Sequence, residues 1–332
     1  GIVFLLFFLG LEFNLDRLLA RRRPIGTAGT IDLANFGAGL VLGWLVFGAF
    51  LPAVLVAGIV YISSSAVITK SLIDLGWIAN DESNPILGTL VYEDLFIAFY
   101  LAVLSAVLLG GGELAGIAVD VGTAMVFLLA LVSSVHFGSR YFQRFLDVDS
   151  EEMFVLRAVA ITVLVAGVAL AIGVSEAVAA FFVGMAFSGT DHLHDLERRL
   201  IPLRDVFAAV FFFWIGIRTD PAVFPAVAGI VAVLVVVTAP TKLFTGFVSG
   251  RIYGLEDRRN VRVGLGMVTR GEFSLIIAAV AADAVVGGTV LTETIPAVAV
   301  GYVLVMSILG TMLMQYSSVF ERFVVDETPE SG

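Results

Sequence analysis

Two adjacent carboxylates, Glu93 and Asp94, interrupt a run that is otherwise apolar from about Pro85 to Leu109. At about 1.5 Å per residue, a helix that begins near Pro85 carries them roughly 12 to 14 Å along its axis, close to the middle of a bilayer. An acid at that depth costs at least ~2.5 kcal/mol on insertion scales, so two neighbouring acids need water, a cation or a basic partner. The pair predicts a functional site; the alternative is a structural ion pair inside a helix bundle.

Two basic residues are candidates for cations within the membrane. Lys242 comes two residues after Pro240, which frees a backbone carbonyl and kinks its helix. Arg270 lies with Glu272 in the stretch GMVTRGEF (266–273), where glycines and two opposite charges interrupt a hydrophobic segment. This pattern indicates a broken helix.

A second candidate break is the run of three serines at 63–65, in the segment before the paired acids. Serine hydroxyls compete for backbone hydrogen bonds and lower the cost of local unwinding, although small residues also serve close helix packing. The two interrupted segments are the third and tenth hydrophobic segments of the chain. Their odd separation makes them cross the membrane in opposite directions, as inverted repeats require, so segments two to four would pair with nine to eleven.

The composition is that of a polytopic membrane protein. Of 332 residues, 59% are hydrophobic and 14% are charged, where soluble domains carry about 25% charged residues. We expect an all-α fold with eleven hydrophobic segments and no room for a soluble domain. Their centres lie near Phe8, Leu40, Ile62, Ala98, Leu128, Leu164, Phe181, Phe211, Ala232, Ile276 and Leu304.

Several functional classes are disfavoured by what the sequence lacks. It contains neither a Walker-type loop nor a Rossmann fingerprint, and its three histidines fall near predicted helix ends. With no cysteine there can be no disulfide, thiolate-bound metal or Fe–S cluster. We therefore expect no enzyme activity, no cofactor and no nucleic-acid partner, and any transport would be driven by an ion gradient.

Basic residues fall on alternate joints between the segments, which sets the orientation because Lys and Arg in short loops stay in the cytoplasm. The opposite joints hold only Arg218. This places the C-terminus in the cytoplasm of a multi-pass protein of the cell membrane, and predicts a surface helix over 189–204. The basic side comprises Arg21–Arg23, Arg140, Arg144, Arg157, Arg198, Arg199, Arg204, Arg251, Arg258, Arg259, Arg262 and Arg322.

With these features in order, the chain resembles the monovalent cation/proton antiporter-2 family, which includes Kef-type potassium/proton and NapA-type sodium/proton exchangers. The resemblance spans essentially the whole chain. It is carried by FLGLE (8–12), SSSAV (63–67), Glu93-Asp94, AVAAFFVGM (177–185), FFWIGI (212–217), Lys242 and GMVTRGEF (266–273).

The resemblance implies a homodimer built from dimerisation helices and a moving core in which two discontinuous helices cross. Residues 1–24 and 151–219 would be the dimerisation part, 25–110 and 221–322 the core, 114–145 a linking helix and 323–332 an acidic tail. The family has about thirteen helices, of which this chain would supply eleven, starting at the third. Kef-type relatives also carry a cytoplasmic regulatory domain, so a separate regulatory domain or subunit is a possible partner.

By the same resemblance, Asp94 would bind the Na⁺ or K⁺ ion and the proton in turn, and Glu93 would pair with Lys242. The hydroxyls of Ser64 and Ser65 would help to complete the ion's oxygen shell. Arg270 and Glu272 would compensate the helix dipoles at the crossing. Relatives more often show Asp-Asp, Asn-Asp or Gln-Asp where this chain has Glu-Asp.

The expected function is exchange of Na⁺ or K⁺ for protons by alternating access around Asp94. The alternative is a cation channel or channel-like uniporter, which would need a continuous polar lining rather than charges gathered at one depth. The sequence leaves open the choice between Na⁺ and K⁺. It also leaves open whether one or two protons move per cation, since that depends on whether Lys242 gives up its proton.

Overall fold

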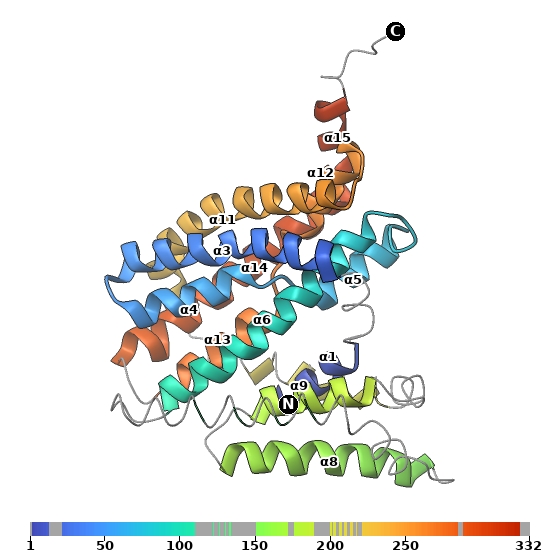
Figure 1. The fold of residues 1–332 in the computed structure, drawn as a ribbon. Coiled ribbons are helices and arrows are strands. Elements are labelled where there is room, and N and C mark those ends of the chain that lie inside the picture. Colours follow the sequence, from blue (N-terminus) through green and yellow to red (C-terminus); the bar gives the residue numbers. More distant parts are fainter. Residues whose placement is uncertain are drawn as a thin grey trace. The chain divides into compact units, whose positions relative to one another are not determined.

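The computed structural model describes residues 2–12, 22–109, 151–171, 176–188, 221–284 and 288–325, with isolated positions between 122 and 133 and between 200 and 217. The elements in this part of the chain are helical, as the composition predicts (Figure 1). They are α1 (Ile2–Glu12), α3 (Arg22–Phe47), α4 (Phe50–Tyr61), α5 (Ser65–Asp74), α6 (Ser83–Leu109), α8 (Glu151–Ala171), α9 (Glu176–Ser188), η1 (Pro221–Val223), α11 (Phe224–Ile252), α12 (Asp257–Gly266), α13 (Glu272–Ala282), η2 (Val290–Thr294), α14 (Ile295–Gln315) and α15 (Ser317–Val325).

Six stretches of the described chain are helical, long and apolar enough to cross a membrane. One of them, Phe50–Asp74, contains the serine run, and the shorter apolar helix Glu272–Ala282 follows the second predicted break. The predicted segment centres fall on or between described helices, except those near Leu128 and Phe211. These two, and most of the predicted surface helix at 189–204, lie outside the described residues. The chain is a multi-pass α-helical membrane protein.

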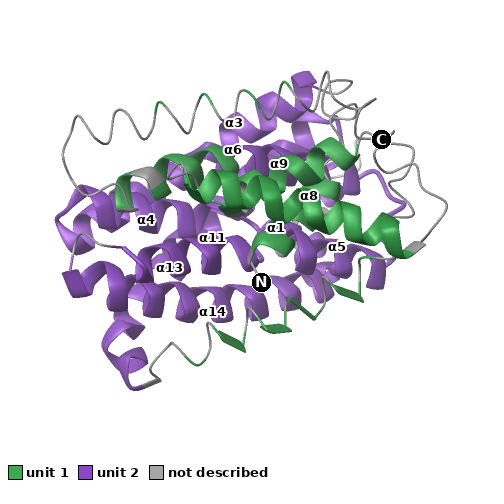
Figure 2. Cartoon of the chain, turned by 90° about the horizontal axis from the view of Figure 1, so that it is seen from below, with its two compact units in different colours: residues 1–20, 98–218 green, residues 21–97, 219–332 purple. Residues whose placement is uncertain are grey.

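The chain divides into two compact units (Figure 2). Unit 1 comprises residues 1–20 and 98–218, and unit 2 comprises 21–97 and 219–332. The segments expected to form the core, 25–110 and 221–322, fall in unit 2 except for 98–110, the C-terminal end of α6. The expected linking helix (114–145) and acidic tail (323–332) lie mostly outside the described residues.

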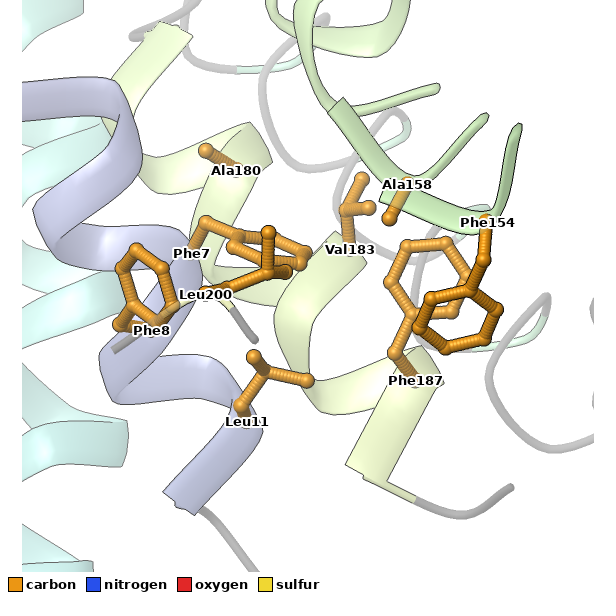
Figure 3. Packing of buried hydrophobic residues seen from close by; sticks show 9 residues of the cluster. All are labelled: Phe7, Phe8, Leu11, Phe154, Ala158, Ala180, Val183, Phe187 and Leu200. Atoms are coloured by element: carbon orange, nitrogen blue, oxygen red, sulfur yellow. The ribbon is translucent and has the colours of Figure 1, made fainter. Parts of the chain in front are cut away.

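Unit 1 is held together by an aromatic core between α1, α8 and α9 (Figure 3). Its members are Phe7, Phe8, Leu11, Phe154, Ala158, Ala180, Val183, Phe187 and Leu200. Helices α1 and α9 approach closely because each has a glycine where they touch. A Cβ added at Gly10 would lie 1.9 Å from the Phe181 carbonyl oxygen, and one at Gly184 would lie 1.9 Å from that of Phe7. Small residues at helix contacts are the usual way in which membrane helices pack without a hydrophobic drive.

Unit 2 repeats one pattern twice: a long helix, an interrupted helix and another long helix. The first copy is α3, then α4 and α5, then α6; the second is α11, then α12 and α13, then α14. Helix α11 packs against α3, α12 and α14, and α3 also packs against α4 (Figure 1). The interruptions fall at 62–64 and 267–271, at the two sites where the sequence predicts broken helices. The prediction of two discontinuous helices is confirmed.

A cluster of charges joins the loop before α6 to α12 and α15. Arg262 donates to Glu82 Oε1 at 2.8 Å and to Glu321 Oε1 at 2.7 Å, and Arg258 donates to Glu321 Oε2 at 2.5 Å. Arg259 binds Asp81. Glu321 lies beyond the last apolar span and is 3% exposed. Burial raises the pKa of its carboxyl, but the hydrogen bonds from Arg262 and Arg258 outweigh burial and leave the pKa below its usual value.

The contact between α1 and α9 gives a first prediction. Gly184→Ala should destabilise the protein by about 1–3 kcal/mol or more, because the added methyl group meets backbone atoms that cannot turn away. The measurement is thermal unfolding in detergent or lipid. Gly167→Ala on α8 is the matched control, since a Cβ there meets nothing within 4 Å. Equal stability of the two variants would contradict the packing argument.

The charge cluster predicts how stability depends on pH. Folding lowers the pKa of Glu321, so its carboxylate stabilises the folded protein when the pH is above 4.5, the ordinary pKa of the group. This stability is lost as the pH falls through the lower pKa of the folded state. Glu321→Gln should lower the unfolding temperature at neutral pH by about 2–4 °C and flatten its fall in acid. The exposed Glu256 gives the control Glu256→Gln, which should keep the wild-type unfolding temperature at neutral pH.

Candidate functional site

The two interrupted helices of unit 2 cross where their backbones are unwound. The Ser64 amide donates to the Thr269 carbonyl at 3.0 Å, and the Ser63 hydroxyl donates to the Met267 carbonyl at 3.2 Å. At the crossing, a Cβ added to Gly271 would lie 2.3 Å from Ser64 Oγ, so a larger residue at 271 would push against Ser64 in the other unwound stretch. The break therefore brings four helix ends together, with backbone groups that lack helical partners.

Arg270 donates hydrogen bonds to backbone carbonyls at the C-terminal helix ends of the crossing. Its fully buried guanidinium donates from Nε to the Val60 carbonyl at 2.9 Å, near the end of α4. From Nη1 it donates to the carbonyls of Met267 at 3.0 Å and Val268 at 2.9 Å, just beyond α12. A cation is favourable here because C-terminal helix ends carry partial negative charge.

Glu272 accepts hydrogen bonds at the N-terminal helix ends of the crossing. It is the first residue of α13, and its carboxylate accepts from the Ser64 hydroxyl at 2.7 Å and from the Ala66 amide at 3.3 Å. Ser64 in turn is the N-cap of α5 and accepts from the Val67 amide at 3.3 Å. One carboxylate therefore lies at the N-terminal ends of both α5 and α13, where partial positive charge stabilises it.

The two predicted acids have different surroundings, as expected for neighbours that point about 100° apart on a helix. Glu93 is fully buried and accepts from the Ser63 amide at 2.6 Å, the Ser63 hydroxyl at 3.1 Å and Lys242 at 2.7 Å. Asp94 is 7% exposed, and the Ser65 hydroxyl lies 3.4 Å from both of its carboxylate oxygens. Because Ser65 is the first residue of α5, Asp94 also lies at a positive helix end.

Lys242 has a second carboxylate partner that is absent from the sequence-based candidates. Its ammonium group donates to Asp32 Oδ2 on α3 at 2.6 Å, in addition to Glu93, and to the Tyr61 carbonyl at 3.0 Å. Asp32 is 1% exposed, and its Oδ1 accepts from Asn35 Nδ2 at 3.0 Å and from the Thr245 hydroxyl at 2.9 Å. The site is therefore a carboxylate–lysine–carboxylate triad rather than a pair.

The sequence does contain a signal for Asp32. It lies inside the hydrophobic segment centred near Leu40, with Asn35 three residues later on the same helix face. Lys242 and Thr245 have the same spacing in the first helix of the second repeat. The shared spacing of these two pairs is overlooked if acidic residues are assumed to lie mostly in loops.

The structure brings most of the predicted site residues together within unit 2. Glu93 lies with Lys242, and Ser65 lies with Asp94. The Ser64 hydroxyl faces Glu272 rather than Asp94, which differs from the expected role in the ion's oxygen shell. Ser63, which is outside the predicted set, contacts Glu93 instead. Arg270 and Glu272 engage opposite kinds of helix end, as described above.

The chemistry available at this site is the exchange of a small cation for a proton at a carboxylate. Hard monovalent cations and protons both seek carboxylate oxygens, and the surrounding hydroxyls and backbone carbonyls are ligands of the same kind. Glu93 is already held by an ammonium group, an amide and a hydroxyl. Asp94 is the member of the acidic pair that lies outside the lysine triad.

Comparison with known proteins identifies the family of this chain. The family described as "Sodium/hydrogen exchanger, transmembrane" matches residues 1–316. This chain belongs to that family. It is 36% identical over 330 residues to the K⁺/H⁺ antiporter subunit KhtU of Bacillus subtilis, covering 98% of this chain and 79% of that protein.

Two further relatives are more distant. The ammonium/H⁺ antiporter subunit AmhT of Alkalihalophilus pseudofirmus is 29% identical over 97% of this chain and 81% of that protein. The high-affinity Na⁺/H⁺ antiporter NhaS3 of Synechocystis is 26% identical over 85% of this chain and 63% of that protein. The similarity to KhtU and to AmhT extends over nearly the whole of this chain.

The triad predicts that removing its ammonium group will lower the stability of the protein. Lys242→Met leaves Asp32 and Glu93 as buried carboxylates without a counter-charge, so it should destabilise the protein by about 3–5 kcal/mol. The triple variant with Asp32→Asn and Glu93→Gln removes the charges and should recover most of that loss. Thermal unfolding of both variants is the measurement, and failure of the triple variant to recover would contradict the charge argument.

Proposed function

We propose that this protein is a secondary antiporter that exchanges a monovalent cation for protons by alternating access, with Asp94 as the carboxylate that carries the cation and the proton in turn. It is a transporter rather than an enzyme. The observation that supports Asp94 most directly is the commitment of its neighbour Glu93, which accepts three hydrogen bonds from Lys242 and Ser63.

The position of Asp94 suits a group that alternates between two ligands. It is buried beside the unwound stretch of the first repeat, where low dielectric strengthens the competition between a cation and a proton. The Ser65 hydroxyl, and carbonyls of the unwound stretch, would supply further oxygen ligands to a dehydrated ion. When the cation binds, the proton must leave, and this competition is the exchange.

The transported ion belongs to the class of small monovalent cations. The names of the three relatives assign K⁺, ammonium and Na⁺ to three different proteins. We propose Na⁺ or K⁺ as the substrate of this chain. A channel or channel-like uniporter is the less favoured alternative, because the buried charges of the apolar spans of unit 2 gather near one crossing.

We further propose that unit 2 is the ion-translocating core and unit 1 the dimerisation scaffold of a homodimer in the cell membrane. The alternation of basic loops supports a cytoplasmic C-terminus. Two relatives are named antiporter subunits, which supports a second subunit as a partner, and we propose a regulatory role for it.

The test is proton flux in proteoliposomes under imposed gradients of Na⁺, K⁺, Li⁺, Rb⁺ or ammonium, followed with a pH-sensitive dye. Asp94→Asn should reduce cation-driven flux to the level of empty liposomes, because the amide cannot exchange a cation for a proton. The control is Asp257→Asn, at an exposed carboxylate 3.2 Å from Arg251. Wild-type flux in Asp94→Asn would remove Asp94 from the mechanism, and single-channel currents would favour the channel.

A further inference from the structure

We propose that Asp32 is a positioning residue that holds Lys242 in its protonated form throughout the cycle, so that one cation exchanges for one proton without net charge movement. This inference rests on the proposed exchange at Asp94. It concerns a carboxylate that lies on a different helix from the acidic pair.

The first argument is the geometry of the ammonium group. A protonated lysine has three N–H donors, and here three acceptors receive them: Asp32 at 2.6 Å, Glu93 at 2.7 Å and the Tyr61 carbonyl at 3.0 Å. A neutral amine would have two donors for three acceptors, and its lone pair would face an oxygen. The arrangement fits the ammonium form.

The second argument is the origin of the two carboxylate contacts. Besides Lys242, the donors to Glu93 both come from Ser63, in the unwound stretch that would rearrange around an ion. The other donors to Asp32 come from Asn35 on α3 and Thr245 on α11, which are continuous helices. Asp32 can therefore keep Lys242 in place while the contacts of Glu93 change.

The third argument is the charge count. With both carboxylates ionised the triad carries one net negative charge, and loss of the lysine proton would raise this to two in a fully buried site. If Lys242 were paired with Glu93 alone, transfer of the ammonium proton to the carboxylate would leave two uncharged side chains. With the second carboxylate present, the same transfer would leave Asp32 beside a neutral amine in place of the ammonium group that it contacts at 2.6 Å.

Among the described residues, the groups that pack around Lys242 from other helices are mostly uncharged. The Tyr61 ring lies 5.1 Å from Nζ, and α14 contributes the hydroxyl of Tyr302, which meets Thr238 one turn earlier on α11 at 2.6 Å. Helix α12 presents Gly264 to the turn that contains Leu243. Asp94 is the further acid next to the triad, and it is the one assigned to exchange.

The experiment measures how many protons move per cation in proteoliposomes of the full chain. With a permeant anion to remove the membrane potential, a tenfold cation gradient should be balanced by about one pH unit for one-for-one exchange and by about half a unit for two protons. Wild type should balance at about one unit and give no current on a solid-supported membrane. Asp32→Asn should shift the balance toward half a unit and generate a transient current.

Two variants separate this role from a merely structural one. Asp32→Glu keeps the carboxylate and should restore silent exchange. Asp74→Asn removes the carboxylate of the exposed Lys70–Asp74 pair, at 2.6 Å, and should leave the stoichiometry unchanged. If Asp32→Asn fails to fold, Thr245→Val, which removes one donor to Asp32, should produce the same current in weaker form.

The outcomes are distinct from those of the parent proposal. Absence of cation-driven flux in wild type would overturn the exchange function itself. Flux with current and two protons per cation in wild type would overturn the role of Asp32 and leave the exchange function standing. Active but electrically silent Asp32→Asn would also overturn that role. If neither substituted protein is active, the wild-type stoichiometry decides.

Discussion

The site depends on one constraint: four helix ends meet in a low-dielectric interior, and their backbone groups must find partners there. Arg270 takes the carbonyl ends and Glu272 the amide ends, and both are buried. Each charge lies at the helix end of opposite partial charge. These two side chains supply part of the hydrogen bonds that the unwound stretches lack.

The remaining buried charges of the site make other contacts at the first break. Glu93 accepts from the Ser63 amide in the first break and from Lys242, which also donates to the Tyr61 carbonyl at the end of α4. Rearrangement of the serine stretch would therefore change the environment of the acidic pair and also the bonds of Ser63 and Ser64 to the second break. The same hydroxyl run serves three different carboxylates, since Ser63, Ser64 and Ser65 contact Glu93, Glu272 and Asp94 respectively.

Much of this was predictable because charges and helix breakers stand out against an apolar background. Glu93, Lys242 and Arg270 are rare residue types at membrane depth, and the breaks follow from serines and glycines in series. Asp32 was missed because a single acid ten residues into a helix resembles a loop residue when segment boundaries are uncertain by a few positions. The partner of each serine could not be predicted either, since adjacent residues in an unwound stretch differ only by backbone geometry. The boundary between the units falls within α6, where the sequence shows no change of composition.

The contacts that join the two repeats bear on how access could alternate. Lys242 on the second repeat binds Asp32 and Glu93 on the first, and Ser274 donates to the Ile59 carbonyl at 2.7 Å across the same divide. The Thr89 and Ser249 hydroxyls lie 3.2 Å apart between α6 and α11. Separating the repeats would expose buried charges and break these bonds together, and removing one partner of a buried ion pair alone costs about 3–5 kcal/mol. These costs oppose opening of the two repeats from each other.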